Sequence, residues 1–332
     1  MTVTGVPLWV WAITALAIIV VIALDFLTVS KTPHEVGIGE AARWSIFYVV
    51  LALVFGGGVW YFLGQASGTE FFAAYLVEKS LSVDNLFVFA IILTQFAVPS
   101  DLQQRVLLVG IVLALAMRAV FIALGAAALA AFSFTFVIFG VLLIWTGIQL
   151  ARHHNEDPDP SENFAVRAIR KRYPFTDQYH GTAMFIRRNG QRIATPMLLV
   201  ILAIGSTDLL FALDSIPATF GVTQNPYLVF TANAFALFGL RALYFLLKGL
   251  LDRLIYLSLG LAAILVFIGV KLVLTWAHET WDAVPKIPTS ASLAVIAAIL
   301  TIATIASLLK SSADPTLRAH AGTLTGPDTE SQ

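Results

Sequence analysis

The sequence predicts an all-α, polytopic membrane protein with about nine transmembrane helices, its N-terminus outside and its C-terminus in the cytoplasm. Of the 332 residues, 58% are hydrophobic and only 12% are charged, and the mean hydropathy is +0.85. Soluble domains seldom have such a composition. The charged residues gather between long apolar runs, and most positive ones gather in alternate connections. We therefore expect a multi-pass protein of the inner or plasma membrane.

Nine apolar segments are each long enough to cross a bilayer as a helix. The first has no Lys or Arg before it, so we interpret it as a retained helix and not as a signal peptide. The predicted spans are 6–29, 44–63, 69–96, 106–131, 134–150, 196–220, 227–250, 254–275 and 290–309. They form one transmembrane domain over 5–310, with a cytoplasmic loop at 151–195 and a disordered tail at 311–332.

The distribution of Lys and Arg gives the expected orientation. Fifteen of the 20 lie in the connections after spans one, three, five, seven and nine. The N-terminus and the connections after spans two, four and six have none, and the connection after span eight has only Lys271, at its edge, and Lys286. Because positive residues concentrate on the cytoplasmic side, the odd-numbered connections are expected to be cytoplasmic.

Composition also excludes several classes of function. The chain has no cysteine, which excludes disulfides, thiolate metal sites and thiol redox chemistry by its own residues. It has neither a phosphate-binding loop nor a phosphorylated-Asp motif, so direct use of ATP is not expected. We expect no enzymatic activity, no nucleic acid partner and no permanently bound cofactor. The sequence does not fix the oligomeric state.

Two of the predicted spans carry a pair of acids with the same separation of six positions. An ionised carboxylate in hydrocarbon is costly, so such an acid usually faces a partner, a cavity or a passing cation. A small polar residue follows the second acid in both spans. The pairs are Glu78 with Asp84 and Asp208 with Asp214, followed by Asn85 and Ser215. This pattern predicts a cation site.

The two acidic spans also belong to a predicted repeat. A shift of 130 residues places Glu78 on Asp208, and a shift of 123 places the helix around Arg118 on the helix around Arg241. Under the orientation above, spans three and six cross the membrane in opposite directions. The sequence therefore predicts an inverted repeat relating spans 3–4 to spans 6–7, with a polar site at its interface.

Helix geometry constrains how the acids are used. At about 100° per residue, two acids six apart point about 120° away from each other, so a straight helix does not aim both at one ion. Either a helix is broken, or the four acids line two faces of a path. Pro217 cannot donate a hydrogen bond to Leu213, so we expect span six to be bent or locally unwound near Asp214.

Other polar residues within the spans have less specific roles. We expect Arg118 and Arg241 each to neutralise an acid in its own half and to hold helices together, and Lys79 to pair with an acid. Asp25 is either an interfacial carboxylate or part of the ion path. Asn233 is either a neutral ligand or an interhelical hydrogen-bonding group.

The charges of these groups suggest the kind of ion. Five intramembrane acids against three basic residues leave a surplus of two negative charges, which matches one divalent cation. The six histidines lie in connections or the tail, so carboxylates, amides, hydroxyls and freed carbonyls are the available ligands. Oxygen-rich sites suit Mg²⁺, Ca²⁺ and Mn²⁺.

Three blocks, at 78–88, 208–218 and 230–247, resemble the signature blocks of the TerC family of integral membrane proteins, named for tellurium resistance. The resemblance covers about residues 5–310 and implies export of Mn²⁺, whereas the residues alone indicate only a hard divalent cation. The expected metal site has Asp84, Asp208 and Asp214 at its core, assisted by Glu78, Asn85, Ser215 and Asn233, with Asp25, Lys79, Arg118 and Arg241 as supporting charges.

The sequence thus predicts a secondary exporter of Mn²⁺ from the cytoplasm, coupled to proton entry, in a lipid bilayer. One alternative is a membrane scaffold or stress-complex component linked to tellurite resistance, without transport of its own. Export of amino acids across the inner membrane is a third reading.

Overall fold

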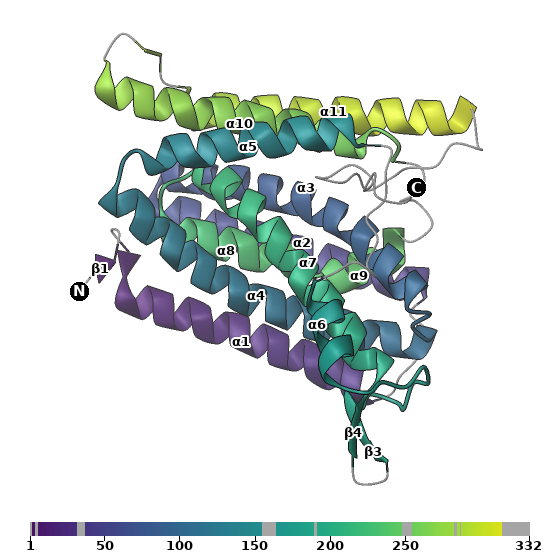
Figure 1. The fold of residues 1–332 in the computed structure, drawn as a ribbon. Helices are drawn as coiled ribbons and strands as arrows, with labels where there is room; N and C mark the ends of the chain where they lie inside the picture. The colour runs from purple at the N-terminus through teal and green to yellow at the C-terminus, as the bar shows by residue number, and fades with distance from the viewer. Residues whose placement is uncertain are drawn as a thin grey trace.

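The computed structural model describes residues 2–3, 6–31, 37–154, 164–188, 191–247, 254–281, 284–285 and 287–313. The protein is an all-α bundle of long helices lying side by side (Figure 1). The long helices are α1 (Leu8–Lys31), α2 (Ile38–Leu63), α3 (Gln65–Gln95), α4 (Ser100–Ala131), α5 (Thr135–Arg152), α7 (Pro196–Phe220), α10 (Leu257–Thr280) and α11 (Thr289–Ala313). The shorter α8 (Pro226–Leu237) and α9 (Leu240–Leu247) follow one another and together cross the bundle.

The predicted membrane class is confirmed. Within the described residues, eight helical segments are long and apolar enough to cross a membrane, with α8 and α9 counted as one. The ninth predicted span is α3, whose 31 residues include four charged ones, Glu70, Glu78, Lys79 and Asp84. The nine predicted spans therefore correspond to the long helices plus the α8–α9 pair. Orientation across the membrane and the inverted relation of the two halves stay predictions.

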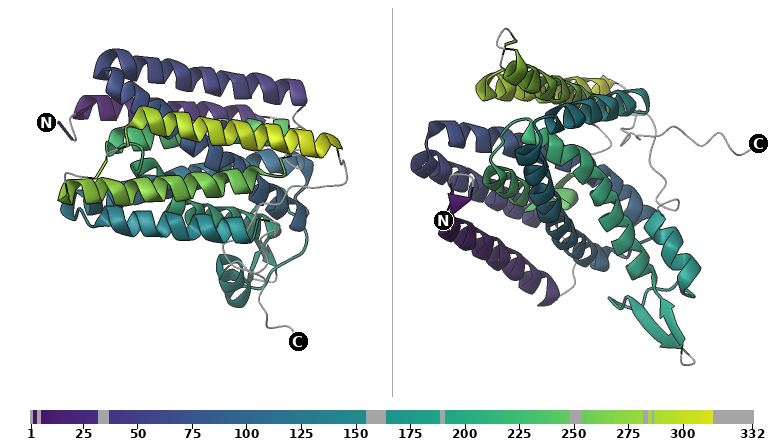
Figure 2. Two further views of the ribbon diagram at one scale, coloured as in Figure 1. Left: turned by 90° about the horizontal axis from the view of Figure 1, so that it is seen from above. Right: turned by 60° about the vertical axis from the view of Figure 1, so that its left-hand side comes forward.

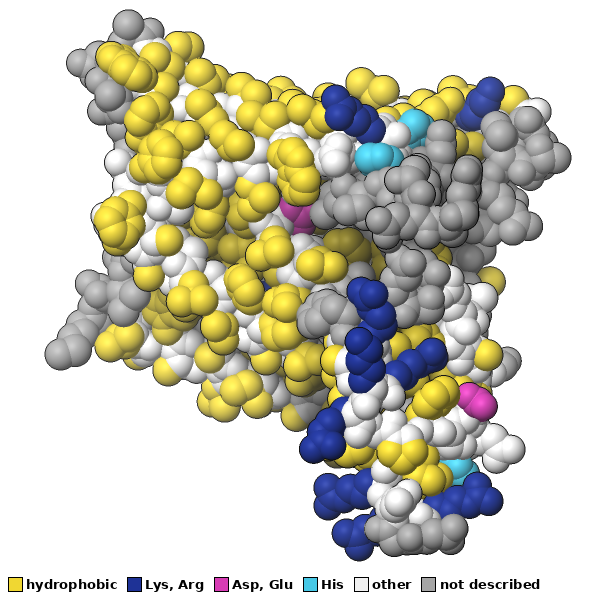
Figure 3. Space-filling view, in the orientation of Figure 1, with side chains coloured by type: hydrophobic (Ala, Val, Ile, Leu, Met, Phe, Trp, Pro, Cys, Tyr) yellow, Lys and Arg dark blue, Asp and Glu magenta, His cyan; other side chains and the backbone are white. Residues whose placement is uncertain are grey.

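The helices α3, α4, α7 and α8 form the centre of the bundle. Helix α3 packs on α8 and on α7, and α4 packs on α7 and on α8. Helix α2 covers α3 and α9, α1 lies against α4, and the α5–α10 pair with α11 forms a further layer (Figures 1 and 2). Among the eight apolar spans, the buried share is greatest in the α8–α9 segment and α7 and smallest in α1, α2 and α11. Apolar side chains cover the flank of the bundle, as expected for a lipid-facing surface (Figure 3).

Small residues let α5 and α10 approach closely. A Cβ atom at Gly140 would lie 2.7 Å from the carbonyl oxygen of Gly269, and a Cβ at Gly269 would lie 2.7 Å from the carbonyl oxygen of Gly140. Gly147 faces the carbonyl oxygen of Ala262 in the same way, at 2.8 Å. Backbone-to-backbone packing through glycines is a common way for membrane helices to associate.

The discontinuous span is the seventh, not the sixth. Helix α7 runs unbroken through Pro217, so the predicted unwinding there is wrong. Pro217 lies in the last turn of α7, where the missing N–H removes only one hydrogen bond near the helix end. Span seven instead breaks at Phe238 and Gly239 between α8 and α9, where Gly239 has a φ of +75°. Glycine adopts this left-handed conformation without the cost that other residues incur.

The predicted cytoplasmic loop contains a small subdomain. It comprises helix α6 (Phe164–Arg172) and a hairpin of β3 (Phe185–Arg188) and β4 (Gln191–Ala194), and it projects sideways from the bundle (Figure 1). Arg188 pairs with Gln191 in the antiparallel register of the two strands. A second, two-residue pairing joins β1 (Thr2–Val3) to β2 (Val6–Pro7). The predicted tail from 311 begins inside α11, and its remainder from 314 lies outside the described residues.

Candidate functional site

Arg118 lies at the centre of the bundle and is 1% exposed. It projects from α4 toward α7 and binds Asp208 through two parallel hydrogen bonds, from Nε to Oδ2 and from Nη2 to Oδ1, both of 3.1 Å. Its Nη1 donates to Glu78 Oε2 of α3 at 3.0 Å and to Ser215 Oγ of α7 at 3.1 Å. A two-pronged contact of this kind is the strongest arrangement between a guanidinium and a carboxylate. Arg118 therefore joins three helices through charge-assisted hydrogen bonds.

The second oxygen of Glu78 is also bound. Thr219 donates from Oγ1 to Glu78 Oε1 at 2.6 Å and to the backbone oxygen of Ser215 at 2.9 Å. Asn233 approaches Glu78 from α8, but among the described residues neither its amide nitrogen nor its amide oxygen has a hydrogen-bond partner of normal geometry. Both Glu78 and Asn233 are fully buried. The cluster thus contains one amide with unused hydrogen-bonding capacity beside a carboxylate.

Asn85 lies on the same face of α3 as Glu78, as the separation of seven residues predicts. With its amide oriented so that the nitrogen donates to Leu81 O at 3.0 Å, its oxygen accepts from Arg118 Nη2 at 3.3 Å. Asn85 is therefore a neutral member of the cluster.

Asp214 is placed differently from Asp208. It is half-buried, and it interacts electrostatically with both Arg118 and Glu78 without an ion pair among the described residues. Asp208, by contrast, is 1% exposed and faces Arg118. This difference agrees with the expected rotation of about 120° between acids six residues apart on an unbroken helix. The side chain of Asp84 lies outside the described residues.

The structure thus brings most of the predicted site residues together. Glu78, Asn85, Asp208, Ser215 and Asn233 surround Arg118, and Asp214 lies at the edge of the cluster. Sequence reasoning missed Thr219. Its separation of four from Ser215 and eleven from Asp208 places all three on one face of α7, so helical spacing was an available signal.

Three carboxylates around one guanidinium carry two surplus negative charges when all are ionised. Buried charges without full compensation are costly, so such a cluster attracts a cation or protons. Within the described residues, no three acidic or histidine side chains are already arranged to hold a metal ion. Arg118 occupies the space between Glu78 and Asp208 instead.

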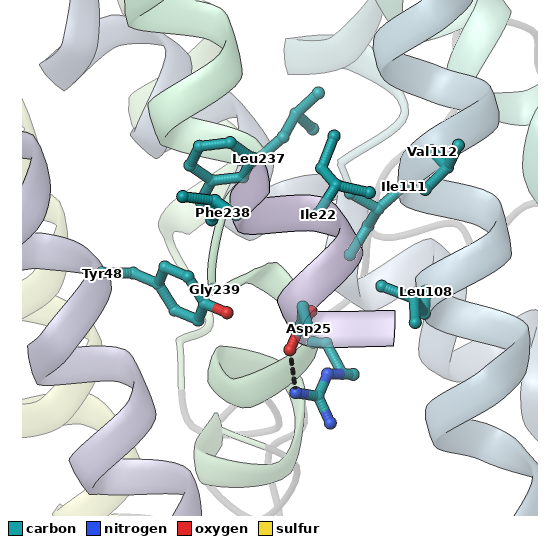
Figure 4. A pocket seen from close by; sticks show the side chains of 11 residues that line it. Ile22, Asp25, Tyr48, Leu108, Ile111, Val112, Leu237, Phe238 and Gly239 are labelled. Carbon is teal, nitrogen blue, oxygen red and sulfur yellow. Dashed lines mark hydrogen bonds and ion pairs between the residues drawn. The ribbon is translucent and has the colours of Figure 1, made fainter. Parts of the chain in front are cut away.

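Arg241 forms a second polar centre, nearer the surface of the bundle. It lies at the start of α9, and its Nη2 donates to Asp25 Oδ1 of α1 at 2.5 Å while its Nη1 donates to Gln104 Oε1 of α4 at 2.7 Å. Asp25, Arg241 and the ring of Tyr48 line a small pocket next to the break at Gly239 (Figure 4). Apolar side chains from α1, α4 and α8 form the other walls of this pocket.

Two expectations about the basic residues are wrong. Arg118 pairs with Glu78 of its own half, as expected, and also with Asp208 of the other half. Arg241 pairs with Asp25 of span one and not with an acid of its own half among the described residues. Lys79 donates to the backbone oxygens of Ala236, at 3.1 Å, and Phe238, at 3.5 Å, and to no acid whose side chain the structure describes. The break between α8 and α9 frees these carbonyl groups, which explains why an ammonium group binds there.

The fold and this buried ionic cluster define a polytopic membrane protein with a polar centre enclosed by apolar helices. The sequence pattern of the integral membrane protein TerC family matches residues 63–314. The chain belongs to the TerC family.

Known relatives are also membrane proteins. The chain is 43% identical to an uncharacterized membrane protein of Myxococcus xanthus over 94% of this chain and 95% of that protein. It is 45% identical to an uncharacterized membrane protein of Mycobacterium tuberculosis over 81% of this chain and 69% of that protein. It is 37% identical, over 89% of this chain and 92% of the relative, to an Escherichia coli protein provisionally named a membrane-bound redox modulator, Alx. No solved structure matches the chain.

Proposed function

We propose that this protein is a secondary transporter that exports a divalent metal cation, Mn²⁺, from the cytoplasm in exchange for protons. One observation carries the proposal: acids from both predicted halves meet around a single arginine in an otherwise apolar bundle. Glu78 comes from α3 and Asp208 from α7, and both are almost completely buried. A protein that only had to span the membrane would gain nothing from so costly a cluster.

The ligand types favour a hard cation. Carboxylate, amide and hydroxyl oxygens are present in the cluster, while thiols are missing from the chain and histidines from its predicted spans. Oxygen donors of this kind suit Mg²⁺, Ca²⁺ and Mn²⁺ better than Cu⁺ or Zn²⁺. The choice of Mn²⁺ among these ions rests on the family resemblance.

Competition with Arg118 supplies a mechanism for binding and release. In this structure the guanidinium of Arg118 forms ion pairs with Glu78 and Asp208 and so partly neutralises their negative charge. A divalent cation entering past the half-buried Asp214 brings twice the charge and competes with Arg118 for the same carboxylates. Figure 3 shows a few acidic atoms exposed between the apolar side chains of the flank, so a carboxylate is accessible from that surface.

The same acids provide the coupling to protons. A carboxylate that binds Mn²⁺ must be deprotonated, so metal and protons compete for one set of groups. Exchange follows when Mn²⁺ leaves to the outside, protons from the outside neutralise the emptied acids, and those protons are released to the cytoplasm before the next ion binds. The broken span at Phe238 and Gly239 lies beside these groups, and discontinuous helices are common where transporters change access.

Export is tested by cellular manganese content. Cells that lack the protein should accumulate Mn²⁺ and grow poorly in excess Mn²⁺, and the wild-type chain should reverse both effects. Asp214→Asn should fail to reverse them at normal membrane abundance, while Asp177→Asn, in the loop subdomain, serves as the matched control. Unchanged manganese across a titration of external Mn²⁺ would contradict export.

A scaffold without transport is the second candidate, and two observations favour it. Every guanidinium nitrogen of Arg118 is hydrogen-bonded, and no three acidic or histidine side chains among the described residues are arranged to bind a metal ion. Both observations are expected of a cluster that only holds helices together. Redox modulation, which the name of the Escherichia coli relative suggests for that protein, cannot use thiols of this chain because it has none. A scaffold predicts that Asp214→Asn leaves cellular manganese unchanged.

A further inference from the structure

The loop subdomain carries a strongly basic surface. Its described residues, 164–188 and 191–195, include seven Lys and Arg residues but one acid, Asp177. All seven are exposed: Arg167, Arg170, Lys171 and Arg172 on α6, and Arg187, Arg188 and Arg192 on the hairpin. We call these seven residues the basic face. Figure 3 shows it as a dark blue area apart from the apolar flank.

Asp177 is the only acid among the described residues of the subdomain, so most of the charge of the basic face is uncompensated there. None of its residues takes part in an ion pair there. Two of them instead lie over aromatic rings, Arg170 over Phe175 at 5.0 Å and Arg172 over Tyr173 at 5.9 Å. Seven like charges on one small subdomain repel each other, so an external anionic partner would lower the energy of this surface.

The subdomain presents these charges from a fixed position. Val166 of α6 is fully buried in the core, and Thr195 donates from Oγ1 to Ala183 O at 2.6 Å. Tyr179 donates from its hydroxyl to Phe96 O, at the end of α3, at 2.8 Å. Burial raises the pKa of Tyr179 to about 12, and like any tyrosine at physiological pH it keeps the proton that this hydrogen bond needs.

The position of the subdomain identifies the partner. Its hairpin extends away from the bundle, across the direction of the long helices, at the level where several of them end (Figures 1 and 2). In a membrane, lipid headgroups surround the bundle at this level. The exposed Phe175, Met184 and Phe185 lie in the same subdomain, and aromatic and apolar side chains mixed with Lys and Arg are typical of a membrane–water interface.

We propose that the basic face binds the anionic headgroups of phospholipids in the adjacent leaflet, which is the cytoplasmic one under the predicted orientation. The contact is electrostatic and spread over several headgroups, because the charges lie on an open surface and not in a pocket. Strand β4 ends directly before Thr195 and Pro196, where α7 starts, so bound lipid would also fix the N-terminal end of the helix that carries Asp208. This inference does not depend on metal transport.

Lipid retention tests the proposal. The full chain is placed in nanodiscs of phosphatidylcholine containing about 30 mol% phosphatidylglycerol, a typical anionic lipid, then released and analysed by native mass spectrometry. We expect wild type to retain phosphatidylglycerol in preference to phosphatidylcholine. The triple variant Arg187→Gln/Arg188→Gln/Arg192→Gln should lose most of that preference, and added salt should weaken it in wild type.

Two control variants separate this effect from misfolding and from total charge. Arg187→Lys/Arg188→Lys/Arg192→Lys keeps the charge and should keep the preference. Arg43→Gln/Arg152→Gln/Lys310→Gln removes three exposed charges elsewhere and should retain phosphatidylglycerol as wild type does.

Four results would overturn the proposal. The first is a wild type without preference for the anionic lipid, and the second is equal loss in the two Gln triple variants. The third is a preference that appears only after Glu156, Asp157, Asp159 and Glu162 are neutralised, because the acidic stretch of this chain would then be the partner of the basic face. A preference for a soluble acidic protein over phosphatidylglycerol vesicles would likewise assign the surface to another partner.

Discussion

Arg118 and Arg241 occupy matching positions in the two predicted repeats, yet their surroundings differ. Arg118 is 1% exposed and binds acids on α3 and α7, one from each half. Arg241 is closer to the surface, and its partners are Asp25 on α1 and Gln104 on α4. One arginine therefore holds the two halves together at the centre, and the other attaches the bundle to a peripheral helix. Matching sequence position does not imply matching roles.

The surrounding helices show more symmetry than the arginines do. Helix α3 packs on α8 and α4 packs on α7, which is the exchange of partners that a two-fold relation of the halves predicts. Gly140 on α5 and Gly269 on α10 contact each other at a separation of 129 residues, close to the 130 that relates the acids. The packing of the helices thus favours the predicted repeat, whereas the contacts of Arg118 and Arg241 do not follow it.

Removal of each arginine provides the largest expected contrast. Arg118→Leu leaves Glu78 and Asp208 buried without a counter-charge, which should destabilise the protein by about 3–5 kcal/mol. Arg241→Leu removes the counter-charge of one acid, Asp25, which is nearer the surface, together with the hydrogen bond to Gln104, and should cost about 1–3 kcal/mol. Thermal unfolding in detergent measures both. The double variant Arg118→Leu/Asp208→Leu should recover part of the loss, and equal effects of the two single variants would remove the distinction between the centres.

The two acids of α7 should respond differently to neutralisation. Asp208→Asn weakens the bidentate contact with Arg118 and should lower stability by about 1–3 kcal/mol, whereas Asp214→Asn should change it little. Both should reduce stabilisation by Mn²⁺, which reaches about 2.7 kcal/mol at a hundred times Kd for wild type. Melting curves with and without Mn²⁺ measure this, with Asp177→Asn as control. Full Mn²⁺ stabilisation in both variants would exclude these acids from the metal site.

The break beside Arg241 should be sensitive to one methyl group. Gly239→Ala forces a left-handed conformation and brings Cβ to 2.8 Å from Tyr48 Cδ2, so a loss of about 1–2 kcal/mol is expected. Gly57→Ala, in α2 with open space around it, should be neutral or slightly stabilising. Unfolding curves of the two variants decide this. If Gly239→Ala unfolded like Gly57→Ala, the left-handed conformation at Gly239 would not be required for stability.

Lys79 should show the smallest effect. Lys79→Met keeps most of the chain length but removes the hydrogen bonds to Ala236 O and Phe238 O, for an expected loss of about 0.5–1.5 kcal/mol. Amide exchange around α8 and α9 should rise in this variant and stay near wild type in Lys79→Arg. An unchanged exchange rate would mean that the hydrogen bonds from the Lys79 ammonium do not stabilise the break between α8 and α9.

The spans and most of the cluster were predictable, because hydropathy and buried charge are properties of single segments. Span six matches α7 over the same residues, and the acids near Asp208 mark the centre of the bundle. The partners of Arg118 and Arg241 were not predictable, since pairing depends on which helices meet. Nor was the break at Gly239, because glycine is frequent in unbroken membrane helices. Thr219 was overlooked because a threonine in such a helix commonly bonds only its own backbone.

Glu78 and Lys79 are consecutive residues of α3, and this adjacency has a mechanical consequence. Their side chains leave the helix about 100° apart. Glu78 engages Arg118 at the ionic cluster, while Lys79 engages the carbonyl groups where span seven is interrupted. Any rotation of α3 about its own axis that withdraws one side chain must also displace the other. A single rigid helix thus transmits changes in charge at the cluster to the geometry of the interrupted span, without an intervening chain of contacts.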